Sequence, residues 1–280
     1  MRIRSVLFTP GDRPGMLDGA LESEADAVVF DLEDGVADDA KPRARTIVTD
    51  AVDDLGDDVD PLVLVRPNPL DDGGADDLDE LATADTAGLA GVVLPKVDDT
   101  ESVRATRGEL LDRNLPGRLW CLLETPAGVL AAPSIAEADG VEALIFGGED
   151  YAAAVGARRT AAGDELLVAK QQVVMAAGAA GISAVDGITS AIQDLDRVRS
   201  DAERARTFGF DGKLAIHPAQ LEPIHEAFAP TEDEIAWAHR VVEVAGGEGG
   251  AVRVDDEMID APLLKRARLV LEQAGESPEA

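Results

Sequence analysis

Eight short apolar runs alternate with segments of helical spacing along the 280 residues, and this alternation restricts the fold more than any other feature. Because alternating strands and helices form parallel sheets, eight such units predict a (β/α)₈ TIM barrel. A doubly wound open sheet is the alternative, since periodicity does not by itself close a sheet. The runs that we interpret as strands lie at 5–10, 26–34, 61–68, 91–97, 119–126, 143–150, 182–188 and 213–218. The helical segments lie at 14–23, 41–54, 76–84, 99–112, 133–138, 165–179, 194–208 and 219–228.

The residues after the eighth unit predict a helical extension with a lid. Residues 231–245 have helical spacing, with Thr231 as the N-cap and Glu234 completing a capping box. The glycines at 246–250 predict the hinge of a lid, and a last helix is expected over 262–274. We therefore expect a barrel domain over 1–230 and a C-terminal helix, lid loop and terminal helix over 231–280.

The chain is strongly acidic, with 25 Lys and Arg against 56 Asp and Glu and a net charge of −31. Such a surface repels nucleic acid and anionic membranes, so neither is expected as a partner. The acidic residues are interleaved with regular apolar segments, which favours a solvated acidic shell suited to a halophilic cytoplasm over disorder. No apolar run approaches the roughly 20 residues of a membrane span, and the N-terminus does not resemble a signal peptide. We therefore expect a cytoplasmic protein.

Ionisable side chains follow nearly every predicted strand. In a (β/α)₈ barrel, chemistry takes place at the carboxyl ends of the strands. A barrel with a purely structural role does not need charged groups there, so we expect a binding or catalytic site at this end. From the first strand to the eighth, the candidates are Arg13, Asp31, Glu33, Asp34, Arg66, Lys96, Glu124, Glu149, Asp150, Asp186 and His217.

Glu124 and Asp150 each end an apolar run and precede a turn of small residues. Two carboxylates that face each other across a cleft can hold a hard divalent cation and leave room for a substrate. The first 216 residues contain no histidine, which excludes a His-rich zinc site and favours oxygen ligands for Mg²⁺ or Mn²⁺. Glu124 and Asp150 are therefore the candidate metal ligands.

Two cationic side chains lie at neighbouring strand ends. Arg66 suits a bidentate clamp on a substrate carboxylate beside the metal. The alternative for Arg66 is a salt bridge to Glu33 or Asp34, and both roles can coexist. Lys96 could form a Schiff base with a keto group, but its acidic surroundings favour a protonated lysine in an ion pair.

Nine segments, in order along the chain, resemble the citrate lyase β-subunit-like family, the CoA-ester lyase branch of the HpcH/HpaI aldolase superfamily. Because they span nearly the whole chain, they are more specific than any single motif. The pyruvate aldolases of this superfamily that use no CoA carry a histidine where this chain has Asp34, which favours the CoA branch. The segments are 4–14, 31–45, 64–68, 94–97, 122–128 (LLETPAG), 146–156 (FGGEDYAAAVG), 186–196, 208–220 and 258–267 (MIDAPLLKRA).

The resemblance implies a Mg²⁺-dependent carbon–carbon lyase. Such an enzyme reversibly cleaves a 2-hydroxyacid CoA thioester, of the malyl-, methylmalyl- or citramalyl-CoA type, to an acyl-CoA and a 2-keto acid such as glyoxylate, pyruvate or oxaloacetate. By position, Glu124 and Asp150 match the metal ligands, and Arg66 matches the arginine that binds the keto-acid carboxylate. Asp260 matches an aspartate on a C-terminal lid that acts in a neighbouring subunit's site. A homotrimer or a hexamer with shared active sites is therefore implied.

On this basis Asp260 is the candidate acid–base, and Glu33 and Asp34 are candidates for ordering water around the metal. Arg13 and Lys213 are candidate contacts for the phosphates of CoA. From the residues alone, a simpler role for Asp260 is to cap the last helix, and Arg13 and Lys213 could form surface ion pairs.

Three related reactions remain open. A malyl-CoA-type thioesterase would use the same metal site and release CoA with a hydroxy acid. A malate-synthase-like enzyme would condense and then hydrolyse. A citrate lyase β subunit would act on a citryl ester that is bound to an acyl carrier. A non-enzymatic binding role would leave the carboxylates at the strand ends without an explanation.

We predict that removing salt destabilises the fold. Charges on the acidic surface repel one another over longer distances in dilute buffer, because the Debye length grows from about 3 Å at 1 M salt to about 30 Å at 0.01 M. The midpoint of thermal unfolding, followed by circular dichroism, should therefore rise with KCl, and so should activity. Full stability and activity in dilute buffer would contradict the acidic-shell interpretation.

Overall fold

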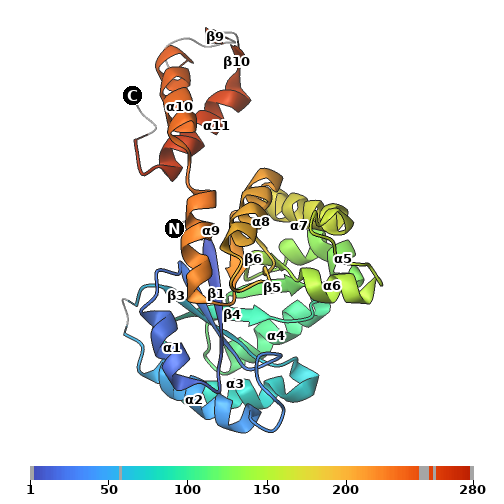
Figure 1. Ribbon diagram of the computed structural model, residues 1–280. Coiled ribbons are helices and arrows are strands. Elements are labelled where there is room, and N and C mark those ends of the chain that lie inside the picture. The colour runs from blue at the N-terminus through green and yellow to red at the C-terminus, as the bar shows by residue number, and fades with distance from the viewer. Residues whose placement is uncertain (1–2, 57–58, 246–251, 255–256, 278–280) are drawn as a thin grey trace. The chain divides into compact units, whose positions relative to one another are not determined.

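The computed structural model describes residues 3–56, 59–245, 252–254 and 257–277 (Figure 1). The chain divides into two compact units, with the boundary between Ala227 and Phe228. None of the described helices is both long enough and apolar enough to span a membrane.

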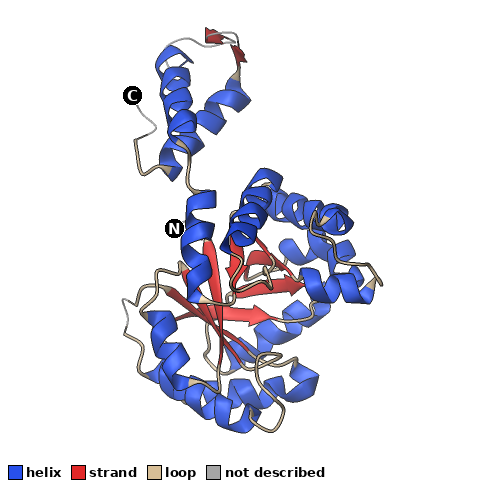
Figure 2. Ribbon diagram, viewed as in Figure 1, coloured by secondary structure: helices blue, strands red, loops and turns tan. Residues whose placement is uncertain are grey.

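The first unit is a closed barrel of eight parallel strands in sequence order (Figure 2). Closure comes from β8, which pairs in parallel with β1 as well as with β7. The predicted (β/α)₈ TIM barrel is thereby confirmed, and the open sheet is excluded. The strands are β1 (Ser5–Pro10), β2 (Ala27–Asp31), β3 (Leu62–Arg66), β4 (Leu89–Leu94), β5 (Leu119–Leu123), β6 (Val141–Phe146), β7 (Ser183–Asp186) and β8 (Gly212–Ala215).

Helices surround the barrel, and local capping decides where several of them begin. Asp99 accepts hydrogen bonds from the backbone N–H groups of Glu101 and Ser102, which starts α4. The helices are α1 (Pro14–Leu21), α2 (Lys41–Asp53), α3 (Ala75–Leu81), α4 (Thr100–Asp112), α5 (Pro126–Ala136), α6 (Gly148–Ala154), α7 (Leu167–Ala180), α8 (Leu195–Phe208) and α9 (Leu221–Phe228). Short helical turns lie at Leu70–Gly74, Asp164–Leu166 and Pro218–Gln220.

Two predicted boundaries near the candidate metal ligands were wrong. The helix expected over 133–138 is α5, which begins at Pro126 because the Thr125 hydroxyl accepts a hydrogen bond from the Gly128 backbone N–H. The strand expected over 143–150 ends at Phe146, and α6 begins at Gly148. Asp150 therefore lies on the first turn of a helix rather than at the end of a strand.

The interior of the barrel is filled by aliphatic side chains and one tryptophan. All eight strands contribute to this core, so no open channel crosses the barrel. The main members are Val6, Val29, Leu64, Val93, Trp120, Leu122, Ile145, Val185 and Leu214.

The second unit contains α10 (Glu232–Ala245), α11 (Ala261–Gln273) and the short antiparallel strands β9 (Val252–Val254) and β10 (Glu257–Ile259). The predicted capping box is confirmed, since the Thr231 N–H donates to the Glu234 carboxylate and the Glu234 N–H donates to the Thr231 hydroxyl. The predicted hinge at 246–250 lies outside the described residues. The two helices pack together through a small core of Ala238, Val241, Val242, Ile259, Ala267, Val270 and Leu271.

Candidate active site

The carboxyl ends of the barrel strands open into a cavity of about 330 Å³. Its charged lining comes from the last residues of β2 and β3 and from the segments that follow β2, β5 and β6, where the charged candidates were expected. Apolar side chains complete the wall: Phe8, Leu122, Phe146, Ile188, Leu214 and Ile216. The polar lining includes Asp31, Asp34, Arg66, Glu124, Glu149 and Asp150.

Arg66 lines this cavity at the end of β3 and is only 8% exposed. Its Nε and Nη2 donate to the two carboxylate oxygens of Asp31, each at 2.6 Å, and its Nη1 lies 2.9 Å from Glu33 Oε2. Burial alone would lower the pKa of Arg66, but Asp31 and Glu33 raise it, so the guanidinium stays charged. The predicted salt bridge to Glu33 is confirmed. The alternative prediction, a salt bridge from Arg66 to Asp34, was wrong, because Asp34 lies beside Lys96 instead.

Asp31 is the strongest partner of Arg66, although the sequence pattern did not predict a separate role for it. The two residues occupy matching positions of β2 and β3, so parallel pairing places their side chains together. Asp31 also accepts hydrogen bonds from the backbone N–H groups of Glu33 at 3.0 Å and Gly35 at 2.8 Å. A Cβ at Gly35 would lie 2.3 Å from Asp31 Oδ2, so only glycine allows this approach. The predicted strands, 26–34 and 61–68, end at Asp34 and Asn68, so their ends do not identify this pair.

Lys96 forms an ion pair, as its acidic surroundings predict. Its Nζ lies 2.5 Å from Glu33 Oε1 and 3.6 Å from Asp34 Oδ1. These contacts, above all the hydrogen bond to Glu33, raise the pKa of Lys96. A protonated amine is not a nucleophile, so the arrangement disfavours a Schiff base at Lys96.

Glu124, at the end of β5, is 3% exposed and points into the cavity. Its Oε1 accepts a hydrogen bond from the Lys96 backbone N–H at 2.8 Å. Gly147 makes room for it, since a Cβ there would lie 2.3 Å from the Glu124 Cβ. Burial raises the pKa of Glu124 to about 8, and the carboxylates of Glu33 and Asp150 add to the rise.

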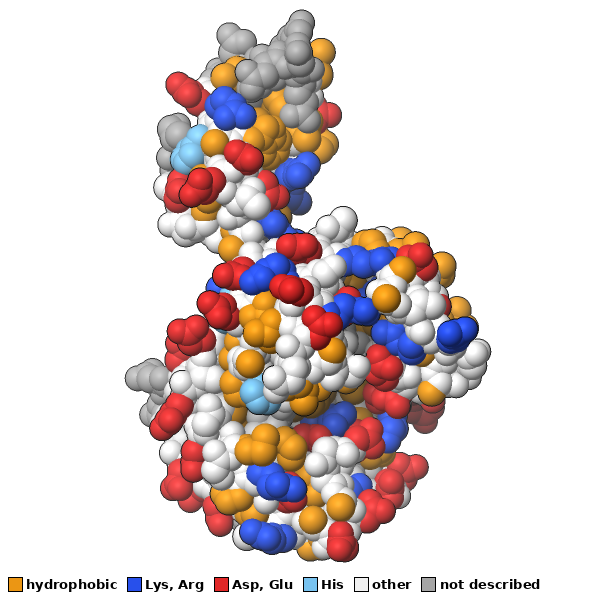
Figure 3. All heavy atoms as spheres, in the orientation of Figure 1, with side chains coloured by type: hydrophobic (Ala, Val, Ile, Leu, Met, Phe, Trp, Pro, Cys, Tyr) orange, Lys and Arg blue, Asp and Glu red, His pale blue; other side chains and the backbone are white. Residues whose placement is uncertain are grey.

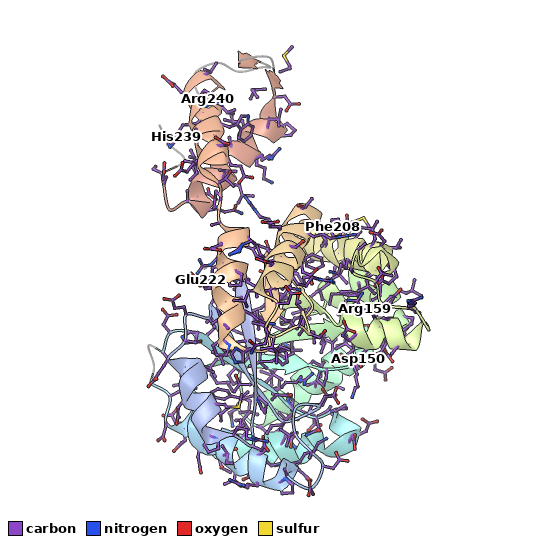
Figure 4. All side chains as sticks on the ribbon, in the orientation of Figure 1. Asp150, Arg159, Phe208, Glu222, His239 and Arg240 are labelled. Atoms are coloured by element: carbon purple, nitrogen blue, oxygen red, sulfur yellow. The ribbon has the colours of Figure 1, made fainter. Side chains whose placement is uncertain are left out.

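Asp150 lines the same cavity from the first turn of α6 and is exposed (Figure 4). Glu149 next to it pairs instead with Arg159, at 3.1 Å. Among the described residues, no three His, Cys, Asp or Glu side chains cluster as a metal-binding group. Two carboxylates with room for water and substrate oxygens suit Mg²⁺, which commonly takes one or two protein carboxylates, and do not suit a structural zinc site. The residues present therefore fit Mg²⁺.

The structure contradicts the prediction that Lys213 contacts the phosphates of CoA. Lys213 is 2% exposed, and its Nζ donates to the Gly187 carbonyl oxygen at 2.5 Å and lies 3.5 Å from Asp186. The residue belongs to the short strand β8 and pairs in register with Ser5, inside the barrel wall. A buried lysine that is held in this way cannot reach a ligand at the surface.

Two further predicted residues of the barrel unit are not part of the cavity lining, and a third belongs to the second unit. Arg13 is exposed beside Asp12, at 3.3 Å. His217 caps the turn that follows β8, where its Nδ1 accepts a hydrogen bond from the Ala219 N–H. Asp260 belongs to the second unit and caps α11, where its carboxylate accepts a hydrogen bond from the Leu263 N–H at 3.4 Å. The capping role that the residues alone favoured is thus observed.

Comparisons with known proteins agree with this fold. A model of the family described as HpcH/HpaI aldolase/citrate lyase matches residues 4–218. The chain is similar to a citrate lyase subunit beta-like protein of Deinococcus radiodurans, with 40% identity over 277 residues that cover 96% of both chains. It is also similar to a (3S)-malyl-CoA thioesterase of Cereibacter sphaeroides, with 34% identity over 97% of this chain and 94% of the relative.

Among solved structures, the chain is similar to protein CitE from Mycobacterium tuberculosis in complex with magnesium, acetoacetate and coenzyme A. The two share 32% sequence identity and superpose with a TM-score of 0.82, over 98% of this chain and 99% of that chain. The similarity therefore extends over both units of the chain.

We predict that Mg²⁺ binding to the metal-free protein releases a proton and strengthens with pH. Because the pKa of Glu124 is raised to about 8, this carboxyl group is protonated at pH 7 and must ionise to bind a cation. The apparent affinity should rise by up to about tenfold per pH unit below pH 8 and then level off. Calorimetric titration with MgCl₂ at pH 6.5, 7.5 and 8.5, in buffers of different ionisation enthalpy, measures both effects. Glu124→Gln should abolish the proton release, and a pH-independent affinity in the unmodified protein would contradict the expectation.

Proposed function

The chain belongs to the HpcH/HpaI aldolase/citrate lyase family, whose members are enzymes, and we propose that it is a Mg²⁺-dependent carbon–carbon lyase. The substrate is a 2-hydroxyacid CoA thioester of the malyl-, methylmalyl- or citramalyl-CoA type, and the products are a 2-keto acid and an acyl-CoA. One observation carries the proposal: Glu124, Asp150 and Arg66 line a single cavity at the carboxyl ends of the strands. The similar CitE protein in complex with magnesium, acetoacetate and coenzyme A supports the ligand classes.

Glu124 and Asp150 hold the metal ion. When bound, Mg²⁺ supplies a Lewis acid for the oxygens of the 2-hydroxy or 2-keto acid. Asp34 lines the cavity and is placed to order water there, whereas Glu33 is only 2% exposed and instead holds Arg66 and Lys96 in place. The apolar side chains of the cavity wall exclude bulk water from the reacting groups.

Arg66 binds the carboxylate of the keto acid. A guanidinium has five N–H groups, and Asp31 and Glu33 engage three of them. The rest are available to a carboxylate in the cavity. Because Asp31 and Glu33 hold the guanidinium in place, its orientation is set before the substrate binds, which lowers the entropic cost of binding.

Asp260 is the acid–base in this proposal. In the cleavage direction it protonates the thioester enolate, and in the condensing direction it removes a proton from the acyl-CoA. Its exposure and its place at the start of α11 leave the carboxylate accessible. The role rests on the match of MIDAP (258–262) to the family's lid, and it requires a homotrimer or hexamer in which the lid acts on a neighbouring subunit. Arg13, which is exposed, is the remaining candidate contact for the phosphates of CoA.

A thioesterase is the second candidate, and the similarity to a (3S)-malyl-CoA thioesterase favours it specifically. The same metal site and the same arginine would bind the substrate, but water would attack the thioester and no keto acid would form. A malate-synthase-like sequence of condensation and hydrolysis, and a citrate lyase β subunit that acts on a carrier-bound citryl ester, are further outcomes of the same test.

We predict a hydroxyacyl-CoA product when the protein, Mg²⁺ and KCl are incubated with acetyl- or propionyl-CoA and glyoxylate, pyruvate or oxaloacetate. Chromatography with mass detection resolves the CoA species. An adduct supports the lyase, and free CoA together with a hydroxy acid supports a malate-synthase-like enzyme. If CoA is released from added malyl-CoA and no glyoxylate is formed, the result supports the thioesterase. Absence of turnover with every free CoA ester would refute the proposed reaction and leave the carrier-bound substrate to be tried.

We further predict that Glu124→Gln and Asp150→Asn each lower Mg²⁺-dependent activity by about a hundredfold or more, because a metal ion contributes several kcal/mol to stabilisation of the transition state. The midpoint of thermal unfolding should change little. Asp139→Asn, which removes one exposed carboxylate from the loop before β6, is the matched control and should keep full activity. Activity that survives both substitutions at the metal site would show that the ligands are wrong.

A further inference from the structure

A second pocket of the barrel unit has a volume of about 30 Å³, and five of the ten residues that line it are cationic. Its charged lining comes from the segment after α6, from α7, from α8 and from β8. Figure 3 shows Lys and Arg side chains gathered over α6 and α8, on a protein whose net charge is −31. We call it the cationic pocket. Among the described residues that line it, Asp201 is the one carboxylate, and the cations are Arg159, Lys170, Arg197, Arg204 and Lys213.

The buried part of this pocket holds two lysines beside a single carboxylate. Asp186 is fully buried and lies 2.8 Å from the Lys170 Nζ and 3.5 Å from the Lys213 Nζ. Burial lowers the pKa of Lys213; Asp186 opposes this effect, and the charge of Lys170 adds to it. Buried positive charge without an equal negative charge is unfavourable, so this part of the pocket favours an additional anion.

Two arginines of α8 have hydrogen-bond donors to spare at the same pocket. A guanidinium has five N–H groups. Among the contacts of the described residues, Asp201 engages only the Nε of Arg197, at 2.9 and 3.0 Å, and Asp164 engages only the Nη2 of Arg204, at 2.5 Å. Both arginines line the pocket, whereas Asp164 does not. Their remaining N–H groups can therefore donate to an anion that enters it.

The size of the cationic pocket and the charge at its entrance restrict the ligand to a small ion. About 30 Å³ is room for about two water molecules, since one water needs roughly 10–15 Å³ of such space. A groove of about 180 Å³ adjoins the pocket and shares Arg159, Ile188 and Arg197 with it. The carboxylates of Glu149 and Asp194 also line this groove, and they repel a large polyanion such as a phosphate ester.

From these observations we propose that the cationic pocket binds one small inorganic anion of the size of chloride. The anion accepts hydrogen bonds from Arg197 and Arg204 and supplies the negative charge that Asp186 alone does not provide for Lys170 and Lys213. Neither candidate metal ligand lines this pocket, so the inference does not rest on the proposed reaction.

The cationic pocket is next to the segment that carries one of the candidate metal ligands. Arg159 follows α6, the helix of Asp150, and pairs with Glu149 and Glu165 (Figure 4). Ile188 lines both the cationic pocket and the active-site cavity. An anion in contact with Arg159 therefore restrains the chain just after α6 while it remains outside the metal site.

The test is NMR of the chloride nucleus in KCl solutions of the full-length protein, without Mg²⁺ or substrate. Exchange with a protein site broadens the chloride signal, and the acidic surface elsewhere repels chloride, so non-specific broadening is small. The protein should broaden the signal in proportion to its concentration, and added bromide should reverse the broadening by competition.

Arg197→Gln and Arg204→Gln should each weaken chloride binding by about tenfold or more, because each removes a charged hydrogen-bond donor from the pocket. Arg199→Gln is the matched control. Arg199 lies on the same helix and also pairs with one carboxylate, Glu226, but it does not line the pocket, so this variant should broaden the signal as the wild type does. Thermal unfolding of each variant, followed by circular dichroism, shows that it is folded.

Three results would overturn the proposal. A wild-type protein that does not broaden the chloride signal has no such site. Broadening that both glutamine variants retain comes from another part of the surface. Competition by inorganic phosphate at the concentrations at which bromide competes would show that the site accepts a larger anion than the pocket allows. If Arg197→Gln does not fold, Arg204→Gln still decides the question, because its side chain is 34% exposed. Each result is independent of whether the lyase assay succeeds.

Discussion

The charge on Arg66 must be compensated inside the barrel mouth, and the arrangement of the site depends on that requirement. An unpaired buried charge costs several kcal/mol, and Asp31 and Glu33 remove this cost by contacting three N–H groups of the guanidinium. Glu33 also pairs with Lys96, which ties together the segments after β2, β3 and β4. Lys96 adopts a left-handed backbone with φ of 51°, a conformation that costs roughly 1–2 kcal/mol. In that conformation its N–H donates to Glu124 while its Nζ reaches Glu33.

Much of the fold could be predicted because its signals are local and periodic. Eight apolar runs alternating with helical spacing gave the barrel, and Thr231 with Glu234 gave the start of α10. The cavity residues could be anticipated for a related reason. In a parallel barrel every carboxyl end meets at one rim, so an acid or a base after a strand is placed there by topology alone. Glu124, Asp150 and Arg66 were brought to one cavity by this rule.

Other features could not be predicted from the sequence, because they depend on strand register and on the orientation of individual side chains. The partner of Arg66 is Asp31 because the two strands pair with those residues opposite each other, and the order of strands alone does not give that register. Lys213 was a candidate contact for the phosphates of CoA because it is basic, whereas Asp186 and the Gly187 carbonyl oxygen hold it within the barrel wall. The start of α6 was not predicted, because the apolar run of β6 continues directly into GGED (147–150). The strand ends before these two glycines, and the helix begins at the second of them, Gly148.

The charges around the cavity explain why a cation belongs there. Among the residues that the structure describes, the five carboxylates of Asp31, Glu33, Asp34, Glu124 and Asp150 lie near two cationic side chains, Arg66 and Lys96. Burial raises the pKa of Glu124 to about 8, and the nearby carboxylates of Glu33 and Asp150 add to the rise. A divalent ion would compensate the charge that protonation otherwise removes, and only then could an anionic substrate enter without repulsion. In the proposed reaction, the acidity of the site and the binding of an acid substrate are therefore compatible when a cation is bound with the substrate.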